Sequence, residues 1–103
     1  MNRTEPLACM MDAIPAEERA THRALIVQLF EEAALERLKT PSGYAFRFEP
    51  DELPSIARFI DSERLCCPFL EITFTVPPSG GPIWLRFAGP GGTREFLDAE
   101  LYR

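Results

Sequence analysis

Two adjacent cysteines, Cys66 and Cys67, are the residues of this chain best suited to chemistry. They follow Glu63 by three and four positions, and residues so spaced on a helix share a face, so one carboxylate and two sulfurs should cluster. Consecutive α-carbons lie about 3.8 Å apart, short of the roughly 4.4 to 6.8 Å of an ordinary disulfide, so we expect two free thiols. Because thiolates select soft ions, the cluster predicts a thiophilic metal or metalloid site.

Two further residues could complete such a site. Cys9 supplies a third thiol if the N-terminal segment folds back over the end of the second helix. His22 is a candidate accessory ligand, although its place on an apolar stripe also fits a partly buried, hydrogen-bonded histidine. Zinc, mercury and cadmium all remain candidate ions, because sulfur and carboxylate ligands alone do not distinguish them.

Two alternatives to metal binding stay open. One is a thiol-dependent enzyme with a cysteine nucleophile and Glu63 or His22 as base, which a depressed thiol pKa would favour. The C-terminal end of a helix is a poor place for such a nucleophile, because the negative end of the helix dipole opposes a thiolate. The other is a protein interaction module whose cysteines only pack, as small apolar side chains do. We therefore predict no catalytic residue.

Composition limits the classes of protein to which the chain can belong. Its 103 residues predict a single domain, 1–103, with residues 1–14 an N-terminal segment packed on the core. The odd cysteine count and the lack of a signal segment near the N-terminus favour the reducing cytoplasm. A formal net charge of -5 argues against nucleic acid as a partner. No apolar run approaches the roughly 18 residues of a membrane span.

Helix and strand patterns place the cysteines at a junction. A long helix is predicted from Pro15 to about Lys39, which lacks glycine and internal proline, followed by a strand over 44–48. A second helix is predicted from Asp51, and Pro68 should end it at about Cys66 because the residue before a proline disfavours helical geometry.

The rest of the chain predicts a hairpin and a last helix. Residues 70–76 and 83–87 alternate apolar with polar side chains, and a segment rich in proline and glycine joins them. A helix should follow Thr93. The predicted fold is a two-layer α+β sandwich, order α-β-α-β-β-α, with a three-stranded, largely antiparallel sheet and helices on one face. Its exposed sheet face, a candidate homodimer surface, would carry Arg47, Glu49, Glu71, Thr73, Thr75, Trp84 and Arg86.

Three segments together resemble a set of small, largely uncharacterised bacterial proteins found beside or fused to regulators of the mercury-responsive type. The segments are Leu7-Ala8-Cys9, the run ERLCCPFL at 63–70 and the run LRFAGP at 85–90. The resemblance implies an association with heavy-metal or thiol stress, carried by Glu63, Cys66, Cys67 and Cys9, and no established enzymatic activity. The chain has no basic helix-turn-helix segment, so a regulatory role would not be direct DNA reading.

Overall fold

The fold is α+β, built on one antiparallel sheet. The computed structural model describes residues 10–101, and within them the sheet has four strands in the order β1-β2-β4-β3. All neighbouring strands run antiparallel. The strands are β1 (Glu36–Thr40), β2 (Gly43–Phe48), β3 (Glu71–Thr75) and β4 (Ile83–Ala88).

Three α-helices accompany the sheet in the described part of the chain. They are α1 (Ala16–Val27), which continues as the π-helical turn η2 (Gln28–Ala33), α2 (Leu53–Cys66) and α3 (Thr93–Leu101). Short 3-10 turns are η1 (Met11–Ala13), η3 (Pro50–Glu52) and η4 (Pro78–Gly80). None of the helices in this part combines the length and apolar character needed to cross a bilayer.

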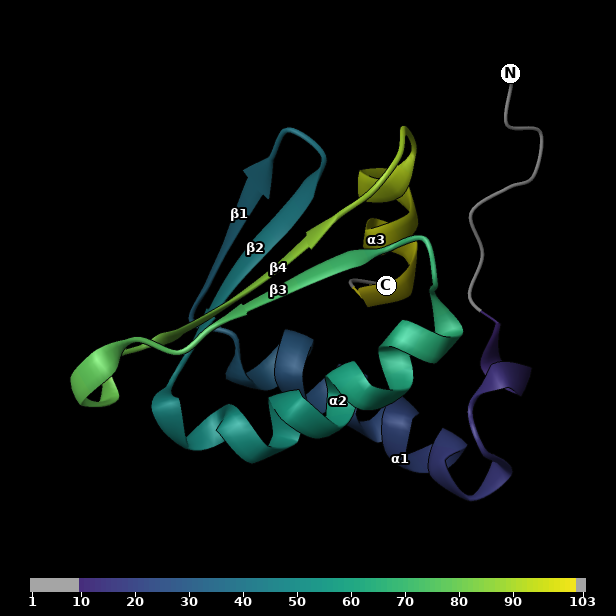
Figure 1. Cartoon of the computed structure of the whole chain (residues 1–103), viewed down its shortest axis with the longest axis horizontal. Helices are drawn as coiled ribbons and strands as arrows, with labels where there is room; N and C mark the ends of the chain where they lie inside the picture. Colours follow the sequence, from purple (N-terminus) through teal and green to yellow (C-terminus); the bar gives the residue numbers. More distant parts are fainter. Residues whose placement is uncertain (1–9, 102–103) are drawn as a thin grey trace.

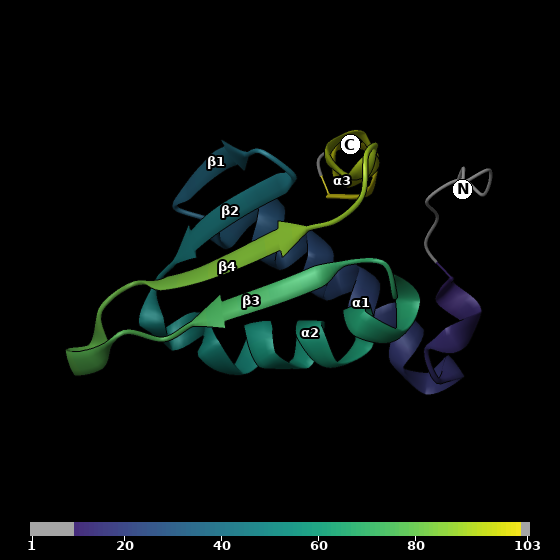
Figure 2. The same ribbon diagram turned by 45° about the horizontal axis from the view of Figure 1, so that its top comes forward.

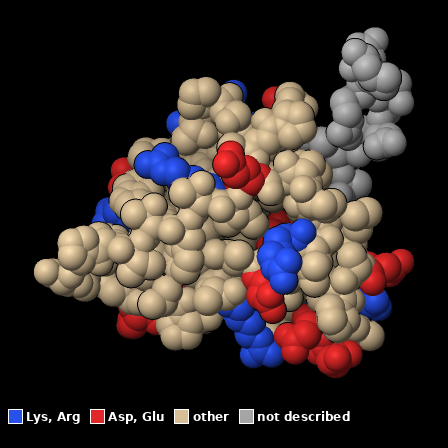
Figure 3. Space-filling model, in the orientation of Figure 1, with Lys and Arg blue, Asp and Glu red and all other residues tan. Residues whose placement is uncertain are grey.

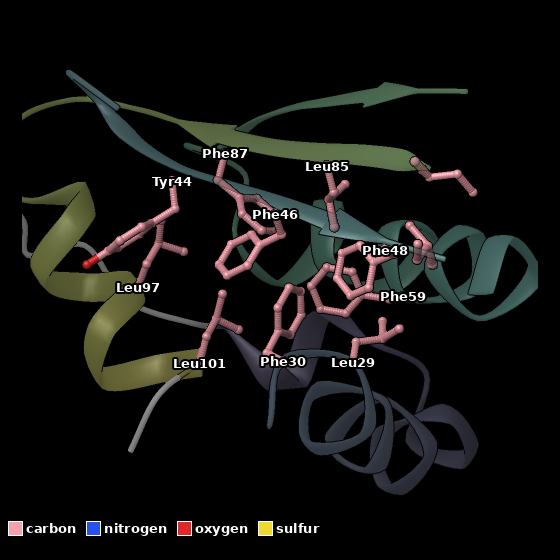
Figure 4. Close-up of a cluster of buried hydrophobic side chains, with 12 residues drawn as sticks. Leu29, Phe30, Tyr44, Phe46, Phe48, Phe59, Leu85, Phe87, Leu97 and Leu101 are labelled. Atoms are coloured by element: carbon pink, nitrogen blue, oxygen red, sulfur yellow. The ribbon is translucent and has the colours of Figure 1, made fainter. Parts of the chain in front are cut away.

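The helices lie on one side of the sheet and enclose the core against it (Figures 1 and 2). Phenylalanine rings dominate this core, and Phe30 of η2 meets Phe46 and Phe59 edge-on at centroid separations of 4.9 and 5.1 Å. Figure 4 shows the rings projecting from the sheet and the helices towards one another. Ring pairs of this geometry add about 0.5 to 1.5 kcal/mol each beyond the area they bury, so the core fixes how α1 and α2 sit on the sheet.

The predicted long helix over 15–39 is wrong at its C-terminal end. Residues 36–40 form β1, an edge strand that pairs with β2 through a tight turn at 41–42. Nε of Arg47 on β2 donates to Oε1 of Glu36 at 2.9 Å. The residues of β1 suit a helix as single residues, but the hydrogen-bond ladder and cross-strand contacts outweigh propensity, which is a weak preference. The element order is therefore α-β-β-α-β-β-α, with four strands instead of three.

The C-terminal end of the second helix and the position of the hairpin are as predicted, whereas α2 begins at Leu53, after the turn η3, and not at Asp51. α2 ends at Cys66, and Cys67 leaves the helical region with φ -126° and ψ 73°. Pro68 accounts for this, because its ring crowds the backbone of the preceding residue in helical geometry. The hairpin joins β3 to β4 across residues 76–82. These local features place both cysteines where α2 turns into β3.

The N-terminal turn lies across the end of α2. The amide of Met10 donates to the carbonyl of Cys66 at 2.8 Å, and Ile14 is fully buried beside both cysteines. The Arg19 guanidinium on α1 holds the turn from the other side by donating to the carbonyls of Met11 and Ile14. Cys9, predicted as a third ligand, lies outside the described residues.

Candidate functional site

The last turn of α2 gathers the three predicted ligands. One carboxylate oxygen of Glu63 and the sulfurs of Cys66 and Cys67 all lie within 4.8 Å of one another. All three residues are 0% exposed. Helical spacing explains the approach of Glu63, since it sits one turn before the cysteines on the same face. Sequence spacing thus anticipated this cluster.

His22 reaches the same cluster from another helix. Its Nε2 lies 2.8 Å from Oε1 of Glu63, although 41 positions separate the two residues. The imidazole also stacks on Phe59 of α2 at 5.2 Å with an interplanar angle of 10°. The packing of α1 on α2 therefore brings the apolar-stripe histidine into hydrogen-bond contact with the Glu63 carboxylate. Whether it also ligates an ion stays a prediction.

Two buried polar atoms of this pair have no hydrogen-bond partner in the described structure: Oε2 of Glu63 and Nδ1 of His22. Buried polar groups are hydrogen-bonded in the great majority of cases, and a partnerless one calls for an explanation such as a bound ion. A buried carboxylate is especially costly without compensation. The histidine accounts for Oε1, and the Cys67 thiol is the protein group that interacts with the rest of the Glu63 carboxylate.

The two cysteines differ in chemical state. Cys67 is a free, buried thiol. Cys66 is disulfide-bonded, so the expectation of two free thiols is corrected at that position. The disulfide does not join Cys66 to Cys67, since Cys67 is free. This agrees with the expectation that adjacent cysteines are too closely spaced for an ordinary disulfide. Spacing excludes only a bridge between neighbours and cannot show whether a sulfur distant in sequence approaches. Ligation through both sulfurs therefore requires reduction of Cys66.

The environment of Cys67 argues against nucleophilic catalysis. Burial, above all, raises the pKa of the Cys67 thiol, and the negative charge of Glu63, a side-chain hydrogen bond to Glu63 and the charge of Glu100 raise it further. A nucleophilic cysteine needs a depressed pKa, because the thiolate is the reactive form. A metal ion reverses this effect, since it displaces the thiol proton when it binds. The site thus fits binding better than thiol catalysis.

Sequence reasoning missed two residues near the sulfurs. Sδ of Met11 lies 3.9 Å from Sγ of Cys66. Met11 and Glu100 both line a neighbouring cavity of about 330 Å³, between α1 and the end of α3. A methionine in an N-terminal segment and a glutamate on the last helix carry no local signal of a site, because only folding brings them to α2.

Comparisons with protein families, with curated proteins and with solved structures found no match to this chain. The class of protein is therefore defined only by the α+β fold and the buried thiol–carboxylate cluster. On the face drawn in Figure 3, basic side chains are interspersed with acidic ones and form no broad basic area. Two expectations from the sequence stay predictions. One is that the protein does not bind nucleic acid, and the other is that it forms a homodimer through the exposed sheet face.

Proposed function

We propose that this protein binds a thiophilic metal or metalloid ion through Cys66, Cys67 and Glu63 in a reducing compartment such as the cytoplasm. The observation that carries the proposal is the buried cluster of a Glu63 carboxylate oxygen with the sulfurs of Cys66 and Cys67, all within 4.8 Å of one another. Two sulfurs bound to one ion at about 2.3 Å can be at most about 4.6 Å apart, a separation comparable with that of this cluster.

His22 supports the proposal by holding the Glu63 carboxylate in place. Ligating carboxylates are themselves commonly hydrogen-bonded, and such outer partners fix the orientation of the ligand. Here His22 holds Oε1 of Glu63 at 2.8 Å, which leaves Oε2 for the ion. The pair is fully enclosed, so the position of the carboxylate is fixed before any ion arrives.

The ligand set favours soft ions of low coordination number. Zinc usually takes four ligands, and the described residues supply three, so zinc would need a fourth from elsewhere, for which Cys9 remains a candidate. Mercury binds thiolates without that requirement. The resemblance to proteins found beside mercury-responsive regulators also favours this class of ion.

The proposal is tested by calorimetric titration of reduced, anaerobic protein with mercury, cadmium and zinc. Because affinity for soft ions resides in the sulfur bonds, Cys66→Ser and Cys67→Ser should each weaken binding far more than Glu63→Gln does. Glu71→Gln, at an exposed position of β3, is the matched charge control and should bind as wild type does. Cys9→Ser shows whether the third thiol contributes.

Stability must be measured on the same variants. Serine in place of a buried cysteine leaves a hydroxyl that costs about 1 to 3 kcal/mol if it finds no partner, so only variants that remain folded are compared. If the wild type binds none of the three ions more tightly than a triple Cys→Ser control does, the proposal is wrong.

A further inference from the structure

The cavity lies beside the cluster, and Met11 contacts both. Met11 lines the cavity, and its Sδ lies 3.9 Å from Sγ of Cys66. Glu100 also lines the cavity, and its charge contributes to raising the pKa of the Cys67 thiol. The volume of about 330 Å³ far exceeds a bare ion, since one water occupies about 30 Å³ in the liquid. The cavity could therefore hold an ion together with the ligands that carry it.

The walls of the cavity carry both signs of charge. Arg23 of α1, Glu31 of η2 and Glu100 of α3 all line it. Arg23 makes no ion pair or side-chain hydrogen bond within residues 10–101 and is exposed. A small amino-acid thiol carries the complementary groups, a carboxylate for the arginine and an ammonium for the glutamates. Soft ions in thiol-rich solution travel as thiolate complexes.

We propose that this cavity receives the thiophilic ion as its complex with a small amino-acid thiol, and that the Met11 thioether accepts the ion on its way to Cys66 and Cys67. The inference rests on the proposed function. In the transfer, two bonds from the ion to the small thiolates break and two bonds to the protein sulfurs form. The protons of Cys66 and Cys67 pass to the two leaving thiolates, so no electrons are exchanged.

Met11 suits this role because a thioether is a soft but weak ligand. It attracts a thiophilic ion without holding it against two thiolates. Its unbranched side chain is also adaptable, so the sulfur can move between the cavity and Cys66. Arg23 then sets the preference for a thiol with a carboxylate, through a charge contact at the cavity rim.

The test is stopped-flow transfer of mercury(II) to the reduced full-length protein from its bis-cysteine complex and from its bis-mercaptoethanol complex. Met11→Leu, which keeps the bulk but removes the sulfur, should slow transfer from both complexes about tenfold, or about 1.4 kcal/mol of barrier. Met10→Leu at the neighbouring exposed methionine should transfer as wild type does. Equilibrium affinity should be nearly unchanged in both variants.

Arg23→Gln tests which thiol the cavity takes. Its half-saturating concentration for the bis-cysteine complex should rise by up to about fivefold, the range of an exposed ion pair. The value for the bis-mercaptoethanol complex, which has no carboxylate, should not change. Arg64→Gln, which alters the net charge equally from outside the cavity, is the control.

The outcomes separate this inference from the proposed function. If the wild type binds the ion tightly but Met11→Leu and Arg23→Gln transfer it as wild type does, the cavity inference is overturned and the metal site stands. If Arg23→Gln weakens uptake from both complexes equally, Arg23 does not recognise the carboxylate of the thiol, and that part of the inference is wrong. If the wild type does not bind the ion, both proposals fail together.

Discussion

Nε2 of His22 and Oε1 of Glu63 lie 2.8 Å apart, with both side chains buried and 41 positions between them in the chain. This contact joins α1 to α2 next to the cysteine pair. It also leaves one oxygen of Glu63 and one nitrogen of His22 without partners in the described structure. The contact therefore holds the two helices together and fixes the orientation of the carboxylate beside the cysteines.

Removing one member of this pair should lower the free energy of unfolding far more than replacing both members with apolar residues. His22→Leu leaves Glu63 without its donor and should lower the free energy of unfolding by about 3 to 5 kcal/mol. The double variant His22→Leu/Glu63→Leu should be more stable than either single variant, because no unpaired buried group remains. Urea unfolding of the ion-free protein measures the three values.

A matched control links the same two helices at the surface. Arg58 of α2 donates to Glu18 of α1 at 3.0 Å, with both side chains substantially exposed. Glu18→Gln should cost no more than about 1 kcal/mol, since water screens this pair. Costs at His22 and Glu63 that simply add in the double variant would show that the two side chains are not coupled.

Oxidation at Cys66 should prevent ion binding. The disulfide removes one of the two sulfurs, so oxidised wild type should bind mercury or cadmium at least about a hundredfold more weakly than reduced protein, equal to about 2.7 kcal/mol. Titrations before and after oxidation, with thiols counted by mass spectrometry, measure the change. Cys66→Ser should bind weakly and equally in both conditions. Tight binding by the oxidised wild type would place the ion elsewhere.

The Cys67 thiol should make stability fall at alkaline pH. Burial raises the pKa of Cys67 in the folded protein, while in the unfolded chain the thiol titrates near 8.5. Above about pH 8.5 the unfolded chain therefore loses a proton that the folded protein keeps, so this stabilising contribution is full below that pH and declines above it. The slope is up to about 1.4 kcal/mol per pH unit.

Comparison with Cys67→Ala isolates this effect. Urea unfolding between about pH 8 and 10, with Cys66 in the same redox state in both proteins, should show a shallower decline for the variant. Equal slopes would mean that Cys67 ionises in the folded protein as readily as in the unfolded chain.

Tyr44 reports on the docking of α3. Its hydroxyl donates to Oδ1 of Asp98 at 2.6 Å, and this hydrogen bond, followed by burial and the charge of Asp98, raises the pKa of Tyr44. Asp98→Asn should lower that pKa relative to wild type, measured from phenolate absorbance with Tyr44→Phe to assign the signal. Asp61→Asn, on α2, should leave it unchanged. A Tyr44 pKa that does not respond would show that α3 is not held by this contact.

The sequence alone determined the features that depend on near neighbours. Pro68 ends α2 at Cys66 through a steric clash with the preceding residue, and helical spacing puts Glu63 beside both cysteines. The alternating pattern of residues 70–76 and 83–87 likewise indicated β3 and β4. These predictions succeeded because each rests on geometry within a few residues.

Tertiary structure decided what depends on distant partners. β1 forms at 36–40 because β2 supplies its hydrogen bonds, and no property of those residues by themselves distinguishes them from the end of a helix. The contact of His22 with Glu63 needs α1 packed on α2, and the contact of Met11 with Cys66 needs the N-terminal turn folded across the end of α2. Contacts over 41 and 55 positions follow from how the whole core packs, which local patterns do not encode.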